Sequence, residues 1–236
     1  MQKYILVVLL FIVTNELASG QQISRVSCDF SVKTKVKGKA ASKLVLGTCY
    51  YDIHVGRLIY DIRFPEKERW IFMDSIQWVV RNDSVVEVLP ASIRPELSVM
   101  HLSLKQELSH YGLKNSSFKI TEVAQDKGLV ITTWAPPAAA SKKIGKVATS
   151  TKNKQLYGVL FYSPAGEIIR KQFYQNYLTM QGLPFPTEVV DIVIEEKEEI
   201  WQQTTYVNVK LNDLKNSNIY TYWPRFIPAG KKSAKK

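Results

Sequence analysis

Three histidines and several aspartates are the side chains of this 236-residue chain best suited to proton transfer or metal binding. His54, His101 and His110 show no metal-ligand spacing with a third donor. Asp61 and Asp191 lie within segments that alternate like strands, where they are most simply surface residues. No glycine-rich phosphate loop, nucleophile elbow or His-Glu-x-x-His motif is present. We therefore expect no catalytic site, no metal and no cofactor, although a triad assembled from distant positions would leave no local pattern.

Two cysteines form the other candidate for chemistry. The segments on either side of Gly38 and Lys39 alternate apolar and polar side chains, which predicts a β-hairpin. If the hairpin centres on these two residues, Cys28 lies opposite Cys49, close enough for a disulfide. An exported protein can keep such a bond. The alternative is two buried free thiols, and a one-residue shift of register would separate the sulfurs.

The densest set of large apolar side chains lies at 57–87. This segment alternates with period two and is interrupted at Pro65, Asp74-Ser75 and 82–84, which is typical of short antiparallel strands. Both faces carry large apolar groups, so we expect a curved sheet whose concave face holds something apolar. The residues expected to line that cavity, with three from a following helix, are Leu58, Tyr60, Ile62, Trp70, Phe72, Ile76, Trp78, Val80, Met100, Leu104 and Leu108.

Residues 92–111 form the one strong helix candidate. Pro95 suits a first helical turn and Gly112 a C-terminal cap, while Glu96 near the start is favourable with the helix dipole. Apolar residues recur at three- and four-residue steps, against a polar side that includes His101. Two roles remain open for such a helix: ordinary packing on a sheet, or a movable lid over a cavity.

After this helix the sequence returns to alternating segments separated by turn residues. We expect strands at 118–123, 129–135, 144–150, 155–162, 167–177, 188–195 and 201–211. The two prolines at 182–186 are expected to break the chain, because proline cannot donate to a strand ladder. The aromatic segment at 216–230 could add an edge strand or wrap the domain. About eleven antiparallel strands with one mid-chain helix are typical of a barrel or a strongly curved half-barrel.

The first twenty residues have the features of a secretory signal peptide. One lysine precedes an apolar core at 4–13, and small residues suit cleavage near Gly20. A membrane anchor is the alternative, but about ten apolar residues are too few to span a bilayer. We expect an exported protein with a signal peptide at 1–20, a single domain at 21–228 and a flexible basic tail at 229–236.

The formal net charge of +11 needs a partner or a physical reason. Nucleic acid is the usual partner of so basic a chain. The export signal and the lack of a binding motif argue against that partner, so we expect no nucleic-acid binding. Outside the cytoplasm, a basic surface meets anionic lipid headgroups, lipopolysaccharide or an acidic partner protein. Plain solubility is the alternative.

The segment at 57–78 resembles the LolA-type periplasmic lipoprotein carriers. That family shows a strand with a basic residue just before a proline, then an aromatic strand, then an Asp-Gly-x-x-Trp turn. This chain has Arg-Leu-Ile-Tyr-Asp-Ile-Arg-Phe-Pro at 57–65, Glu-Arg-Trp at 68–70 and Asp-Ser-Ile-Gln-Trp at 74–78. Ser75 replaces the usual glycine. The later order of helical segment, hairpin and strands also fits, so the resemblance covers about 25–228.

The resemblance implies an unclosed antiparallel β-barrel of about eleven strands, with a helical lid over an apolar cavity and no cofactor. It also implies that a basic residue on an early strand holds the lid closed, and Arg63 is the best match. The expected function is an exported, non-catalytic carrier or binder of lipid or lipoprotein acyl chains in the bacterial periplasm. Membrane-associated envelope proteins and an anionic membrane surface are further expected partners. The alternative is an envelope accessory or docking protein that uses the same fold without a ligand.

Overall fold

The computed structural model describes residues 22–195 and 198–224. The expected signal peptide at 1–20 and basic tail at 229–236 lie outside these residues. The described chain is mainly β, with thirteen strands in one antiparallel sheet that does not close. The strands are β1 (Arg25–Val36), β2 (Ser42–Asp52), β3 (Arg57–Phe64), β4 (Glu68–Met73), β5 (Ile76–Arg81), β6 (Ser84–Pro90), β7 (Lys119–Asp126), β8 (Leu129–Ala135), β9 (Val147–Lys152), β10 (Gln155–Tyr162), β11 (Ile168–Met180), β12 (Leu183–Glu195) and β13 (Glu198–Leu211).

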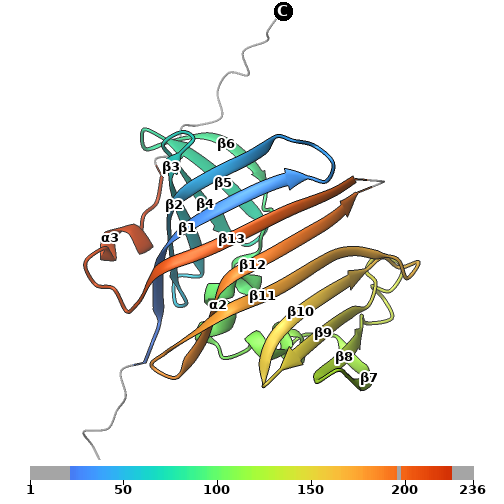
Figure 1. Cartoon of the computed structure of the whole chain (residues 1–236). Helices are drawn as coiled ribbons and strands as arrows, with labels where there is room; N and C mark the ends of the chain where they lie inside the picture. The colour runs from blue at the N-terminus through green and yellow to red at the C-terminus, as the bar shows by residue number, and fades with distance from the viewer. Residues whose placement is uncertain (1–21, 196–197, 225–236) are drawn as a thin grey trace, which may run out of the picture.

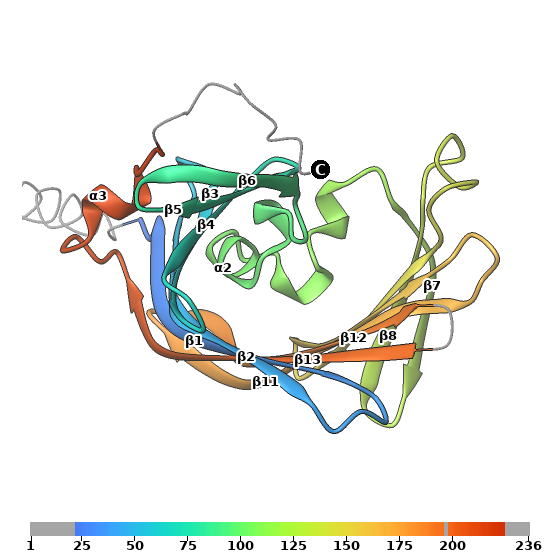
Figure 2. The ribbon, with the colours of Figure 1, turned by 90° about the horizontal axis from the view of Figure 1, so that it is seen from above.

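The strand order follows the chain, with one long-range pairing. The order is β6-β5-β4-β3-β2-β1-β13-β12-β11-β10-β9-β8-β7, so the first strand pairs with the last (Figure 1). The two edges of the sheet are therefore β6 and β7, which are consecutive in sequence. The chain between them runs through the hollow of the strongly curved sheet (Figure 2). The helical segment that joins the two edges therefore lies on the concave face.

Two-residue turns with left-handed backbone close four of these hairpins. The central turn residues at 82–83, 127–128, 153–154 and 181–182 all have positive φ. Two-residue turns of this kind match the right-handed twist of strands and are favoured by Asn, Asp and Gly. The abundance of such pairs explains why the chain folds back so often.

The expectation of about eleven strands is two short of the thirteen observed. The prediction that 182–186 breaks the chain is also wrong, because Gly182 belongs to the two-residue turn and β12 begins at Leu183. Pro184 and Pro186 are tolerated because β12 pairs with β13 only from Glu188 onward. At 183–187, one edge of β12 has no hydrogen-bonded neighbouring strand. The missing N–H of a proline on that edge therefore breaks no hydrogen bond of the sheet.

The predicted helix at 92–111 is broken into short pieces. These are the 3-10 turn η2 (Pro95–Leu97), the helix α2 (Val99–Leu104), and the 3-10 turns η3 (Leu108–His110) and η4 (Leu113–Asn115). Ser98 is extended and caps α2, its hydroxyl accepting from the amide of His101 at 3.2 Å. Because an N-cap residue lies outside the helix, α2 cannot continue back to Pro95. Gln106, with a φ of 57°, ends the helical path on the other side.

Two apolar cores lie on the two faces of the sheet. The larger one joins the concave face to the helical segment, and includes Cys28, Leu58, Met100, Tyr174 and Tyr206. The smaller one lies on the convex face, where the short helix α3 (Ser217–Tyr220) inserts Tyr220 beside Tyr50, Ile59, Ile71 and Trp78. The C-terminal aromatic segment therefore wraps the sheet as far as it is described, and adds no edge strand there.

Candidate functional site

A cavity of about 520 Å³ lies between the concave face and the start of the helical segment. Strands β1 to β4 form one wall, and β11 to β13 form the other. Ser92, Ile93, Leu97 and Val99 close the side that faces the hollow of the sheet. The cavity is thus built from three parts of the chain that meet only because β1 pairs with β13.

Aromatic rings form the most apolar part of the cavity wall. Tyr60 packs edge-to-face against Phe30 on one side and Phe72 on the other, with ring centroids 4.8 and 5.7 Å apart. Trp70 extends this wall along β4. Edge-to-face packing holds such rings in defined positions, so the wall presents a fixed apolar surface.

The opposite part of the wall carries charge. Arg170 Nε and Nη2 donate to the two carboxylate oxygens of Asp191 at 2.8 and 2.6 Å. Burial opposes the charge of Arg170, but the bonds to Asp191 outweigh it and raise the pKa of the guanidinium. Glu195 also reaches the cavity, and it is exposed. Among the described lining residues, one cation therefore faces two carboxylates.

The tyrosines of the cavity remain neutral near pH 7. Burial raises the pKa of Tyr60, Tyr174 and Tyr206 far above the ordinary value for a phenol. Burial also raises the pKa of neighbouring Tyr111 to about 12. These phenols can donate hydrogen bonds but cannot act as bases near neutrality.

The structure brings together some of the sequence-predicted cavity residues. Tyr60, Trp70 and Phe72 line the cavity itself. Five others belong to the concave core around it without lining it: Leu58, Ile62, Met100, Leu104 and Leu108. The early strands and the helical segment thus face one another as the sequence predicted.

Ile76, Trp78 and Val80 do not join this face. Trp78 and Val80 are part of the convex core, and Ile76 is 40% exposed. The cause is the two-residue turn between β4 and β5, which pairs Phe72 with Gln77 and thereby puts residues of opposite parity on the same face. The prediction that Ile76, Trp78 and Val80 line the cavity is therefore wrong.

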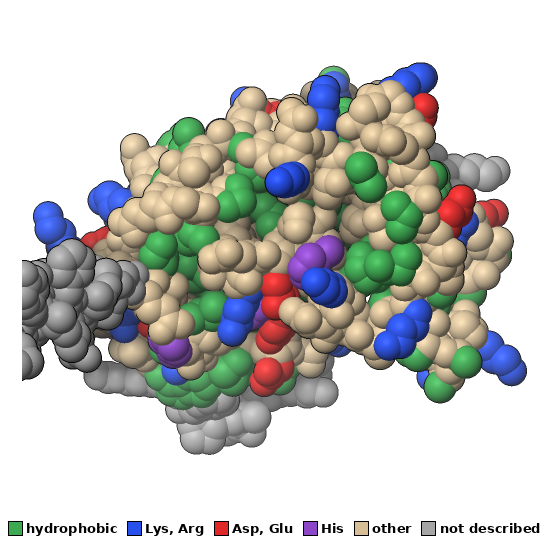
Figure 3. Space-filling view, turned by 90° about the horizontal axis from the view of Figure 1, so that it is seen from below, with side chains coloured by type: hydrophobic (Ala, Val, Ile, Leu, Met, Phe, Trp, Pro, Cys, Tyr) green, Lys and Arg blue, Asp and Glu red, His purple; other side chains and the backbone are tan. Residues whose placement is uncertain are grey.

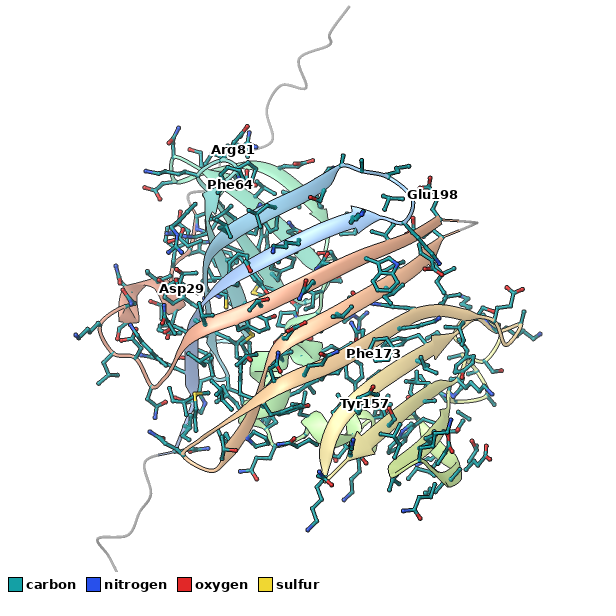
Figure 4. The ribbon with its side chains drawn as sticks, in the orientation of Figure 1. Asp29, Phe64, Arg81, Tyr157, Phe173 and Glu198 are labelled. Carbon is teal, nitrogen blue, oxygen red and sulfur yellow. The ribbon has the colours of Figure 1, made fainter. Side chains whose placement is uncertain are left out.

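Arg63 also lies away from the helical segment. Its guanidinium donates to Thr48 Oγ1 at 2.9 Å and to Asp29 Oδ1 at 3.3 Å. Figure 4 shows Asp29 on β1, and because the next residue, Phe30, lines the cavity, Asp29 points to the convex side. Arg63 is mostly exposed and ties three strands together there. The predicted lid contact is therefore not formed by Arg63.

The two cysteines have the predicted register. Cys28 is paired directly with Cys49, and both side chains are buried in the concave core. Their Sγ atoms are 3.0 Å apart and both thiols are free in this structure. Burial raises the pKa of the Cys28 thiol, which keeps it protonated near neutrality. The disulfide itself stays a prediction.

His101, on the expected polar side of the helical segment, contacts the sheet. Its Nδ1 and the Tyr51 hydroxyl are hydrogen-bonded at 2.6 Å, which joins α2 to β2. Burial lowers the pKa of His101 below its ordinary 6.5, so the neutral imidazole is favoured. This contact anchors the helical segment to the sheet where Arg63 was expected to do so.

The wall formed by β11, β12 and β13 was missed by sequence reasoning. It contributes residues such as Gln172, Tyr174, Asp191 and Thr204 to the cavity. Their alternation with apolar neighbours was visible in the sequence, but which parity faces inward depends on pairings between distant strands.

Within residues 22–195 and 198–224, no helix has the length and hydrophobicity of a transmembrane span. The described residues also contain no group of three His, Cys, Asp or Glu side chains that could hold a metal ion.

Lysine and arginine side chains are spread over the face seen in Figure 3, and they do not gather in one patch there.

Comparison with known proteins shows what fold the chain has. No protein-family model matches the sequence, and no curated protein matches it. A LolA superfamily protein from Nitrosomonas europaea superposes with a TM-score of 0.56 at 15% identity, over 84% of this chain and 90% of that one. A putative outer membrane lipoprotein-sorting protein domain from Vibrio parahaemolyticus gives a TM-score of 0.57 at 11% identity, over 90% and 98%. A DUF1329 family protein from Desulfovibrio piger gives 0.56 at 9%, over 89% and 93%. The chain therefore has a LolA-like fold: an unclosed antiparallel β-barrel with a helical segment on its concave face.

Proposed function

We propose that this protein binds an acyl chain of a lipid or lipoprotein in the concave cavity and carries it through the bacterial periplasm. The observation that carries the proposal is the cavity of about 520 Å³, with its wall of aromatic and aliphatic side chains. Pockets that take small ligands have volumes of roughly 300–1,000 Å³. The likeness of the fold to a lipoprotein-sorting domain supports the same function.

The energetics of burial fit an acyl ligand. Each methylene moved out of water contributes roughly 0.8 kcal/mol, so a fourteen-carbon chain would contribute about 10 kcal/mol. Loss of rigid-body freedom and ordering of the chain offset part of this gain. A single chain still leaves enough for useful and reversible binding.

Non-catalytic action fits the cavity chemistry. The charged lining residues Arg170 and Asp191 are bonded to each other, and the tyrosines are held neutral by burial. A general base needs a pKa near the working pH, and Arg170 and the buried tyrosines, whose pKa values are raised, do not meet that requirement. The cavity therefore suits binding and release.

A ligand-free docking module would offer the C-terminal aromatic segment to a partner. In the described part of that segment, Tyr220 is buried in the convex core and Trp223 packs against Trp78 with ring centroids 5.4 Å apart. Tyr222 donates a hydrogen bond to Asp83. These side chains are used within the molecule, which favours the carrier proposal.

A matched pair of substitutions on β2 tests the proposal. Val45 lines the cavity, whereas Leu44 is next to it on the opposite face of the strand, and both are partly buried. Val45→Trp should fill the cavity and weaken binding of a fluorescent fatty acyl probe at least tenfold, while Leu44→Trp should bind normally. Native mass spectrometry of protein purified from a bacterial periplasm should show an added lipid mass. A folded Val45→Trp protein with unchanged probe affinity would argue against the cavity as the binding site.

A further inference from the structure

A row of polar side chains crosses the concave face near one end of the cavity, with Arg170, Val193 and Glu195 beyond it. Direct pairing joins Gln172 to Asp191, Asp191 to Gln202, and Gln202 to Thr34 across β11, β12, β13 and β1. All four side chains line the cavity. We call these four residues the polar row. Its side chains lie side by side because directly paired residues share a face of the sheet.

The next row along the same strands is mostly apolar. Two residues away, Tyr174 pairs with Val189, Val189 with Thr204, Thr204 with Val32, and Val32 with Val45. All five line the cavity. Beyond them lies the aromatic wall around Phe30 and Tyr60. The cavity therefore changes from polar to apolar along the strand direction, as an amphiphile does along its length.

The polar row has unused donors and acceptors. Within the described part of the chain, the Gln202 amide and the Thr34 hydroxyl form no hydrogen bond, while the Gln172 carbonyl oxygen accepts from the Tyr174 hydroxyl at 3.0 Å. An amide offers both donors and acceptors, and a hydroxyl does the same. A ligand head that lies here meets groups of both kinds.

The charges around the row disfavour an anionic head. Arg170 is bonded through two nitrogens to Asp191, and Glu195 adds a second carboxylate to the same lining. A carboxylate or phosphate head would approach two negative charges, and the one cation is already paired. An uncharged head with several hydroxyl groups meets no such repulsion.

We propose that the polar row recognises the uncharged, hydroxyl-bearing head of a single-chain amphiphile, whose acyl or alkyl chain lies along the aromatic wall. This inference rests on the function proposed above, and adds the class of ligand. Glycerol and sugar heads share the required chemistry, since both present neighbouring hydroxyls that donate and accept.

Binding of three probes with the same chain length tests the inference. The probes are 1-monomyristoylglycerol, tetradecyl glucoside and myristate at pH 8, measured by displacement of a fluorescent acyl probe and by native mass spectrometry. The wild-type protein should bind at least one uncharged probe about tenfold more tightly than myristate, the effect of about two neutral hydrogen bonds. Tighter binding of the glucoside would identify a sugar head, and tighter binding of the glycerol ester a glycerol head.

Variants of neighbouring glutamines on β13 locate the effect. Gln202→Leu keeps the approximate shape of the side chain and should reduce the preference to less than threefold, with myristate binding unchanged. Gln203→Leu is the matched control, because Gln203 is exposed and bonds to Glu188 at 2.8 Å on the convex face. Thr34→Val is a second variant of the polar row, expected to reduce the preference in the same direction.

The outcomes separate this inference from the proposed function. Equal affinity for all three probes, or an unchanged preference in both polar-row variants, overturns the inference and leaves acyl-chain binding intact. A wild-type protein that takes up none of the probes, including the fluorescent one, overturns both.

Discussion

The start of the helical segment has two faces with different neighbours, and mutation should separate their roles. Met100 on α2 is 0% exposed and belongs to the concave core. Leu97 in η2 is 40% exposed and lines the cavity. We predict that Met100→Ala lowers the stability of the fold without weakening ligand binding. Leu97→Ala should do the reverse.

The two effects can be estimated from burial. Replacing a fully buried Met by Ala costs about 2–5 kcal/mol, and we expect about 3 kcal/mol for Met100→Ala. With a urea m-value of about 3 kcal/mol per molar, the unfolding midpoint falls by about 1 M. Leu97→Ala removes three carbons, and a bound chain can cover the 40% of this residue that is exposed, which is worth about 1 kcal/mol. That corresponds to about fivefold weaker binding.

Two assays on the same samples check this prediction. Urea unfolding followed by tryptophan fluorescence and circular dichroism gives the midpoint and m-value, and titration with the acyl probe gives the affinity. Met100→Ala should bind within about twofold of wild type, and Leu97→Ala should unfold within about 0.5 M of it, since the protein buries 60% of that residue. A midpoint shift below about 0.3 M for Met100→Ala would refute the reasoning, because the helical segment would then lie outside the cooperative core.

Three further predictions follow from single positions. Gly47→Ala should abolish folding or lower the melting temperature sharply, because a Cβ there would lie 2.3 Å from the backbone oxygen of Asp61; the yield of soluble protein and thermal unfolding check this. The free energy of unfolding should fall as the pH drops below about 6.5, because burial lowers the pKa of His101 and the unfolded chain takes up the proton first. His101→Gln should reduce the fall of urea midpoints from pH 7.5 to 5, with a residual slope from His110, whose pKa burial also lowers; an equally steep fall in that variant would exclude His101 as a cause. Under oxidising conditions Cys28 and Cys49 should form a disulfide, seen as a loss of 2 mass units on intact mass spectrometry and a loss of thiol titre; persistent free thiols would contradict it.

The cysteine register shows where sequence reasoning succeeds. The turn at Gly38 and the clean alternation on both sides predict a hairpin, and the structure confirms the register centred on Gly38 and Lys39 that puts Cys28 opposite Cys49. A short hairpin needs only local information, because the turn length fixes the register.

The convex position of Trp78 shows where the same reasoning fails. Its partner across the turn is Ile71, so the even-numbered cavity set ends at Phe72. Whether parity is kept or reversed across a hairpin depends on one residue of turn length. The residues around Asp74 did not distinguish the two cases, since Ser75 stands where a glycine would have signalled the turn type.

Local patterns in the sequence predicted the mainly β fold class, most strands, the hairpin that carries Cys28 and Cys49, and the contribution of 92–111 to the apolar core. These depend on period-two alternation, turn residues and apolar spacing, which act over a few residues. The tertiary structure alone decided that β1 pairs with β13, joining Val26 to Leu211 and completing the cavity from both ends of the chain. It also decided which face of β11 to β13 points inward, and so created the polar row. Pairings across about 180 residues arise from burial of the whole sheet face, a cooperative property that local patterns do not encode.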